Sequence, residues 1–159
     1  MMDTDPKRTI LISSPVPEKT QSQIATLEKA LGRFRKAIPA MACEFDHLIR
    51  EVVLVVGQPD LGFTFQSGTT YMLWGALFIN LEKLGNDVEI IETFAHECAH
   101  SILFGHMSDE PLVWNTEDEL FSSPLRDDGR PMDGIYHATY VSARMHWAMS
   151  ALLASDELN

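Results

Sequence analysis

Apolar residues recur at intervals of three and four positions near the start of the chain, which is the spacing of one face of a helix. Residues 24–38 carry such a stripe between lysines, glutamates and arginines. Pro39 interrupts the stripe, and a second helical piece is predicted over residues 41–49. Residues 1–14 lack this periodicity, so we expect a loose N-terminal arm ahead of two packing helices.

A run of β-branched and apolar residues follows these helices and predicts a small sheet. Residues 52–56 have the composition of a buried strand, which ends at Gly57. Residues 63–66 and 71–80 are two further strand candidates, and the turn-forming residues 67–69 separate them. The sheet is therefore expected to be mixed or antiparallel.

Two more helices are predicted in the second half of the chain. Asn86 can accept hydrogen bonds from free backbone amides while Glu89 reaches back to it, so a helix is expected from there to about Gly105. Residues 106–131 are polar, with several Asp, Ser and Pro residues, which predicts an ordered loop. The last helix is predicted to begin at a cap on Asp133.

The charge of −11 is distributed unevenly along the chain. Residues 1–50 contain 8 Lys or Arg and 6 Asp or Glu, whereas residues 51–159 contain 4 and 17. An acidic surface repels phosphate backbones, so we expect no nucleic-acid partner. Two cysteines are too few for a disulfide framework, and no apolar run reaches membrane-spanning length. A cytoplasmic protein without a membrane partner is therefore expected.

His96, Glu97 and His100 form the motif His-Glu-x-x-His inside the third predicted helix. Residues four apart lie on the same face of a helix, so both histidines can present a ring nitrogen to one ion. In metalloproteases with this motif the glutamate is the general base, which makes Glu97 a candidate catalytic residue. The motif predicts a single catalytic metal ion.

A site that is open for chemistry needs a third protein ligand, and two residues compete for this role. Glu119 follows His100 after 18 intervening residues, a spacing that resembles glutamate-zincin peptidases of the aminopeptidase type. His137 lies one turn into the last predicted helix, which could pack against the motif helix and direct the imidazole inward. The pattern alone leaves both open.

A second motif follows the first. Residues 123–137 have the sequence Ser-Pro-Leu-Arg-Asp-Asp-Gly-Arg-Pro-Met-Asp-Gly-Ile-Tyr-His. This segment resembles the Ser-Pro-Trp-Arg-x-Asp-Pro-Arg-Pro-Leu-x-Gly stretch that follows the metal motif in the HExxH-type peptide β-hydroxylases. Residues 63–68 and the predicted strand ending at Asn80 are also similar to that family, so the resemblance covers roughly residues 50–150.

The resemblance implies an oxygenase dependent on iron(II) and 2-oxoglutarate. It implies His96 and His100 as metal ligands, with His137 as the third. It also implies that Arg126 or Arg130 binds a carboxylate of 2-oxoglutarate. Guanidinium suits this task because it matches a carboxylate with two parallel hydrogen bonds. Glu97 would then orient substrate or a water molecule. Glu119 stays open as a carboxylate ligand, since non-haem iron sites usually include one.

The substrate implied is a peptide or a natural-product intermediate that is hydroxylated at an unactivated carbon. Leu125 and Gly129 stand where the family has Trp and Pro. A carrier-bound or small-molecule substrate is therefore an alternative to a peptide. The sequence does not fix the oligomeric state.

Two other classes of protein fit the first motif. In a zinc metallopeptidase, Glu97 would deprotonate a metal-bound water and Glu119 would be the third ligand. In a metal-stabilised binding protein, all four positions around the ion would be filled by protein.

The expected fold class is α+β, in one domain spanning residues 1–159. A zincin-like metal-binding helix would pack on a small mixed sheet, between the N-terminal helices and a C-terminal helix.

Overall fold

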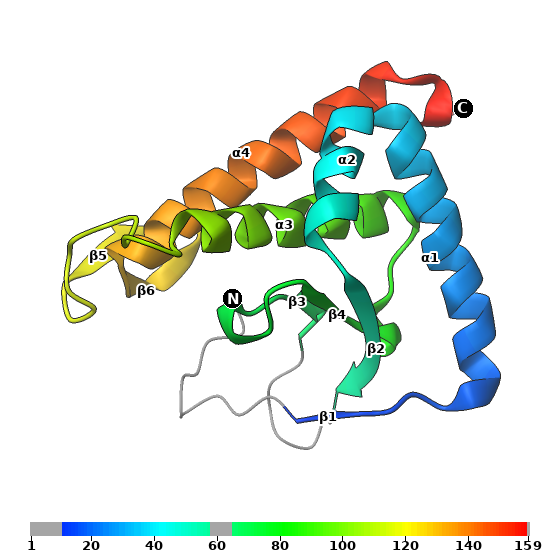
Figure 1. The fold of residues 1–159 in the computed structure, drawn as a ribbon, viewed down its shortest axis with the longest axis horizontal. Coiled ribbons are helices and arrows are strands. Elements are labelled where there is room, and N and C mark those ends of the chain that lie inside the picture. Colours follow the sequence, from blue (N-terminus) through cyan, green and yellow to red (C-terminus); the bar gives the residue numbers. More distant parts are fainter. Residues whose placement is uncertain (1–10, 58–64, 159) are drawn as a thin grey trace.

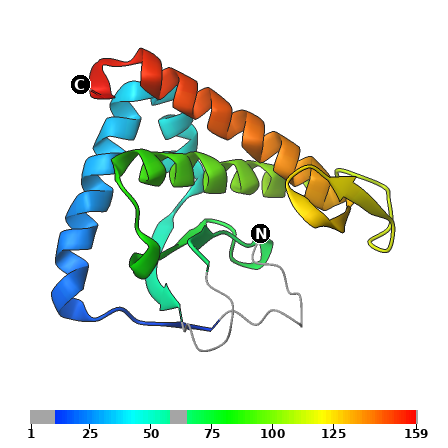
Figure 2. The same ribbon diagram turned by 180° about the vertical axis from the view of Figure 1, so that it is seen from behind.

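The computed structural model describes residues 11–57 and 65–158. They form a mixed α+β fold with helices α1 (Pro17–Ala37), α2 (Pro39–Leu48), α3 (Asp87–His106) and α4 (Met132–Ala154). Figures 1 and 2 show α3 across the middle of the molecule, between the sheet and α4. The expected α+β class and the helix break at Pro39 are confirmed, because α2 begins at that proline, where a missing amide hydrogen costs nothing.

Four strands form the sheet, in the order β1 (Ile12–Ser13), β2 (Glu51–Gly57), β4 (Ala76–Asn80) and β3 (Ser67–Gly68). β2 and β4 are parallel, whereas β1 and β3 pair antiparallel with their neighbours. The sheet is therefore mixed, and the strand predicted over residues 52–56 is confirmed as part of β2.

The strand predicted over residues 71–80 is wrong in its first half. Tyr71–Leu73 is instead a short 3₁₀ helix, and Gly75 has a φ of 102°, which favours glycine and breaks an extended chain. Contacts with α3 explain the turn: the Tyr71 ring packs edge-on against Phe104, and Trp74 Nε1 donates to the carbonyl of Ser101 at 3.0 Å. Tertiary packing therefore overrides the strand propensity of this aromatic segment.

The strand predicted over residues 63–66 and the turn over 67–69 are also misplaced. Residues 63 and 64 lie outside the described residues, and residues 65–66 are not in a strand. The predicted turn contains β3, which pairs with β4 in the register Ser67↔Ile79. The polar side chains that suggested a turn are used for contacts with α3 instead, as described below.

Two further expectations need correction. Residues 1–10 of the predicted arm lie outside the described residues, but Ile12–Ser13 forms β1 against the edge of β2. The predicted loop 106–131 contains a hairpin of β5 (Leu120–Ser123) and β6 (Arg126–Pro131), which projects at one end of the molecule in Figure 1. A turn closes it, where the Ser123 hydroxyl accepts from the amide of Leu125.

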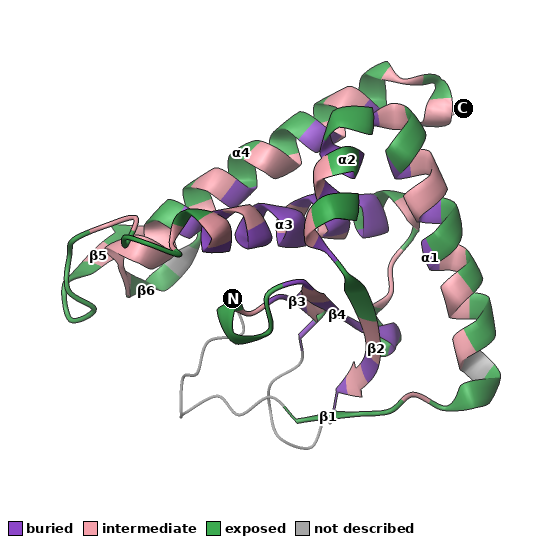
Figure 3. Cartoon of the chain, viewed as in Figure 1, coloured by how far each residue is buried: buried purple, intermediate pink, exposed green. Residues whose placement is uncertain are grey.

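Three phenylalanine rings from three helices form the centre of the core. Phe34 of α1, Phe45 of α2 and Phe94 of α3 are each at most 3% exposed, and their ring centroids lie 5.0–6.0 Å apart. Full burial of such a side chain contributes about 1.5–3 kcal/mol. Buried residues follow α3 along most of its length (Figure 3), so the core fixes the helix that carries the histidine motif.

The start of α3 is fixed by the capping box that the sequence predicts. The Asn86 side chain accepts from the amides of Val88 and Glu89 at 2.9 and 3.2 Å, and Glu89 accepts from the Asn86 amide at 2.7 Å. By contrast, Asp133 does not cap α4: the N-cap is Pro131, and Asp133 accepts from the adjacent amide of Gly134. Asp133 lies inside the first turn, where its carboxylate accepts from one of the free amides of the helix start.

We expect Asn86→Ala to lower the free energy of unfolding by about 1 kcal/mol, because two amides of α3 lose their acceptor. This corresponds to a fall of roughly 2–4 °C in melting temperature, measurable by circular dichroism. Asn86→Asp is the matched control, since a carboxylate can accept the same bonds. Equal melting of the alanine variant and the wild type would contradict the role of the cap.

Candidate functional site

α3 and α4 bring three histidines together beside the core. His96 and His100 come from α3, and His137 comes from the first turns of α4. His100 and His137 are 6% and 4% exposed, and both rings pack near the buried ring of Phe104. The structure thus brings together the two motif histidines and one of the two candidate third ligands.

The three rings form a continuous series of contacts that ends at a methionine on each side. Nε2 of His96 lies 3.3 Å from Nε2 of His100, and Nδ1 of His100 lies 3.0 Å from Nδ1 of His137. At the two ends, Nδ1 of His96 lies 3.2 Å from Sδ of Met145, and Nε2 of His137 lies 3.5 Å from Sδ of Met107. We call these five side chains the histidine chain.

The pair His96–His100 fits a metal ion in donor type and in spacing. Two nitrogens bound to one tetrahedral ion at about 2.0–2.1 Å lie roughly 3.3–3.4 Å apart. The observed Nε2–Nε2 distance of 3.3 Å falls in that range. His137 does not complete the set as it lies, because it contacts the opposite nitrogen of His100. Accordingly, no group of three His, Cys, Asp or Glu side chains is arranged to hold an ion within residues 11–57 and 65–158.

Burial keeps all three imidazoles neutral. It lowers the pKa of His96 and of His137, and it lowers the pKa of His100 to about 2. A neutral imidazole has a free electron pair on one nitrogen, which is the form that binds metals. Burial also raises the pKa of the Cys98 thiol to about 12, so this motif cysteine stays protonated at neutral pH.

The carboxylate of Glu97 is held by two hydroxyl groups from the region of β3. Ser67 Oγ donates to Oε1 at 2.7 Å, and Thr69 Oγ1 donates to Oε2 at 3.0 Å. Glu97 is only 2% exposed, and Thr69 is 1% exposed. Both carboxylate oxygens are therefore engaged, and the bonds connect the edge strand of the sheet to the motif helix.

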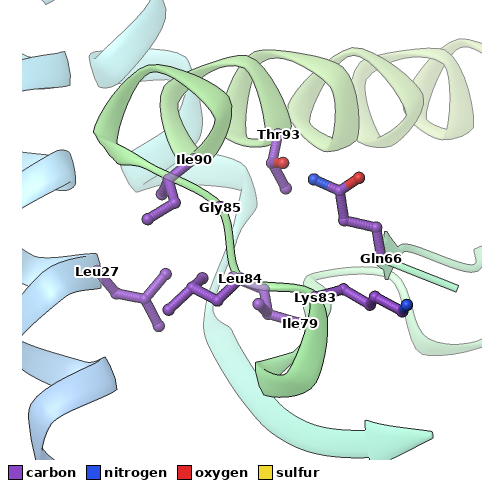
Figure 4. A pocket seen from close by; sticks show the side chains of 8 residues that line it. All are labelled: Leu27, Gln66, Ile79, Lys83, Leu84, Gly85, Ile90 and Thr93. Atoms are coloured by element: carbon purple, nitrogen blue, oxygen red, sulfur yellow. The ribbon is translucent and has the colours of Figure 1, made fainter.

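An open cleft of about 240 Å³ lies beside His96 and Glu97, which both line it. Its other lining residues are Ser67 of β3 with the preceding Gln66, Glu92 and Thr93 of α3, and Met145 of α4. A neighbouring cavity shares Gln66 and Thr93, whose side chains lie between α3 and the sheet in Figure 4. That cavity has a volume of about 10 Å³, hardly enough for one water molecule, so of these two hollows the cleft is the one with space for a substrate.

The structure places the other predicted site residues around the hairpin. Glu119 is fully exposed, and its oxygens accept from Asn115 and Thr116; these bonds lower the pKa of its carboxyl group. It makes no described contact with the histidine chain. Arg130 of β6 packs its guanidinium over Gly134, where an added Cβ would lie 3.3 Å from Nε. Gly134 precedes His137 by almost one helical turn, so Arg130 lies over the same end of α4 as His137.

Arg126 lies in β6, where it pairs with Ser123, and its side chain is outside the description. The hairpin thus carries both candidate arginines on one strand that leads into α4.

Sequence reasoning missed four residues that contact Glu97 or one of the three histidines. Ser67 and Thr69 were interpreted as turn residues, and nothing in the sequence singled out Met107 as a site residue. Met145 was not singled out as a site residue either. One weak signal was available: Ser67 and Thr69 are two positions apart, so they can face the same side of an extended segment.

No protein-family model matches the chain, and no curated protein sequence matches it. Among the described helices, none is both long and apolar enough to cross a bilayer.

Proposed function

We propose that the protein is a mononuclear metal-dependent oxygenase, which uses iron(II) and 2-oxoglutarate to hydroxylate an unactivated carbon of a peptide or natural-product intermediate. The observation that carries the proposal is the His96–His100 pair, with Nε2 atoms 3.3 Å apart at the edge of an open cleft. In this proposal α3 is the metal-binding helix of a zincin-like arrangement, packed on the mixed sheet.

The position of Glu97 favours an oxygenase over a zinc peptidase. A general base needs an oxygen within hydrogen-bond reach of the water that it deprotonates. Both oxygens of Glu97 already accept hydroxyl hydrogens, from Ser67 and Thr69. The third ligand that the peptidase requires, Glu119, is exposed and bonded to its own loop.

Different residues of this chain would have separate roles in such a reaction. His96 and His100 would hold the ion, and bound iron would supply the oxygen chemistry of hydroxylation. Arg130 or Arg126 would bind a cosubstrate carboxylate from the hairpin side. The cleft would take the substrate, with Gln66 and Glu92 as polar contacts on its walls. Glu97 would hold the β3 region against α3, so that the wall of the cleft keeps its shape.

The proposal is tested by adding iron(II) and 2-oxoglutarate to metal-free protein without oxygen. We expect one equivalent of iron to bind and a visible charge-transfer band to appear when 2-oxoglutarate is added. His96 and Glu97 line the same cleft, which is the observation in favour of the peptidase. Absence of the band, together with peptide hydrolysis restored by zinc, would replace the oxygenase by that alternative.

Arg130→Ala is expected to raise the 2-oxoglutarate concentration that gives half of the band by about tenfold or more, because a charge-assisted pair is lost. Iron binding should be unchanged, since Arg130 is not a ligand in this proposal. The measurement is the same anaerobic titration. Arg126→Ala is the paired variant: a larger effect there, with none at Arg130, would transfer the role to Arg126.

A further inference from the structure

The four contacts of the histidine chain match the three ring protons of its neutral imidazoles when the fourth contact, between two ligating nitrogens, holds a metal ion instead of a proton. Each neutral imidazole carries one N–H and one free electron pair. Three histidines therefore supply three protons, whereas the chain makes four contacts, two between nitrogens and two between nitrogen and sulfur. Ligation of one ion needs free electron pairs on Nε2 of His96 and Nε2 of His100, which lie 3.3 Å apart, and each of the other three contacts can then hold one of the three protons.

The thioethers at the ends decide where two of the protons lie. A thioether sulfur can only accept a hydrogen bond. Nδ1 of His96 therefore donates to Met145, and Nε2 of His137 donates to Met107, at 3.2 and 3.5 Å. The remaining nitrogens of these two rings, Nε2 of His96 and Nδ1 of His137, then carry free electron pairs.

His100 lies between these two electron pairs and has one proton to give. Its Nδ1 is 3.0 Å from Nδ1 of His137, whereas its Nε2 is 3.3 Å from Nε2 of His96. The shorter contact is the normal length of a nitrogen–nitrogen hydrogen bond, so the proton belongs on Nδ1. Two free electron pairs then face one another between Nε2 of His96 and Nε2 of His100.

We propose that His137 is a positioning residue that does not bind the ion: it accepts the Nδ1 proton of His100 and so directs Nε2 of His100, together with Nε2 of His96, at the metal. Met145 acts in the same way on His96, and Met107 on His137. This inference rests on the proposed metal site, and it identifies the side chains that orient the ligands His96 and His100. Two histidines then hold the ion, and the other positions are open to cosubstrate and water.

The arrangement has a physical reason. A metal-bound imidazole usually donates its other N–H to an acceptor, which fixes the ring and raises the basicity of the ligating nitrogen. The common acceptors are carboxylates and carbonyls, but the nearest carboxylate in the motif, Glu97, is engaged by Ser67 and Thr69. His137 and Met145 take that role for the two ligands.

The first experiment reads the ring protons directly, in full-length protein without metal. Long-range ¹H–¹⁵N correlation spectra distinguish the two neutral forms of each imidazole. We expect protons on Nδ1 of His96, on Nδ1 of His100 and on Nε2 of His137. A proton on Nε2 of His100 would overturn the proposal. Met145→Leu should convert His96 into a mixture of both forms, whereas Met149→Leu, on the same helix, should leave it unchanged.

The second experiment counts ligands with iron(II) alone. X-ray absorption should find two imidazoles at the ion in the wild type and also in His137→Ala. The dissociation constant of iron(II) should rise about tenfold in His137→Ala. His137→Gln keeps an acceptor oxygen and should recover much of the affinity, which a merely structural role would not predict. Three imidazoles in the wild type and two in His137→Ala would make His137 a ligand and overturn the inference.

The two experiments fail separately. If the wild type binds no iron, the proposed function and the ligand assignment are both wrong. The proton positions in the metal-free protein still test the histidine chain itself. If iron binds but the imidazole count or the proton on His100 differs, only the role of His137 is wrong.

Discussion

The His96→Ala variant is expected to bind iron(II) more than a hundredfold more weakly than the wild type, and to lose all metal-dependent activity. His96 supplies one of the two nitrogens that face each other at 3.3 Å, and alanine offers no donor in its place. Loss of a side chain that hydrogen-bonds a metal ligand already lowers the metal affinity about 10–100-fold, so loss of the ligand itself should lower it further. Isothermal titration of metal-free protein with iron(II) measures the effect.

His146→Ala is the matched control for that experiment. His146 is exposed on α4, next to Met145 in the sequence, and it is not part of the histidine chain. We expect its substitution to leave the dissociation constant and the stoichiometry unchanged. One equivalent of iron(II) bound by His96→Ala at wild-type affinity would contradict the metal site, even if activity were lost.

Glu97→Ala is expected to destabilise the fold strongly, whereas Glu97→Gln should largely preserve it. Alanine leaves the buried hydroxyls of Ser67 and Thr69 without their acceptor and opens a cavity. Hydrogen bonds to a charged group contribute about 1.5–3 kcal/mol each, so we expect a loss of about 3 kcal/mol or more. For a chain of this size that is a fall of roughly 6–12 °C in melting temperature.

Glutamine is informative because it separates position from proton transfer. Its oxygen can accept from one hydroxyl while its amide group donates to the other, so the β3 region stays attached to α3. The variant cannot act as a general base. Retained activity of Glu97→Gln supports the positioning role, and complete loss in a folded, metal-loaded variant would favour the peptidase. Glu110→Gln, which alters an exposed carboxylate outside the lining of the cleft, is the control for the change in charge.

Features that depend on neighbours along the chain were predictable from the sequence. The capping box at Asn86 depends on two residues three positions apart, and the helix break at Pro39 depends on a single proline. The same holds for the pair His96 and His100, which one turn of helix places on one face. These patterns fixed the helices and two of the site residues.

Features that depend on distant contacts were not predictable. Nothing near Ser67 in the sequence tells that its hydroxyl bonds a carboxylate 30 residues away. His137 was a candidate ligand from the sequence. Its contact with Nδ1 of His100, however, depends on how α4 packs against α3. The hairpin in the predicted loop was missed because its strands are short and polar, with Gly129 among them, and such residues are typical of turns.

Between residues 90 and 105, α3 has no exposed residue. A helix without an exposed residue over this length can change mainly where its neighbours change with it, because the packed interior tolerates little difference in volume. The hairpin of β5 and β6 has the opposite freedom, with most of its side chains in water. Variation in descendants of this chain should therefore accumulate in the hairpin, while the packed residues of α3 are inherited almost unchanged.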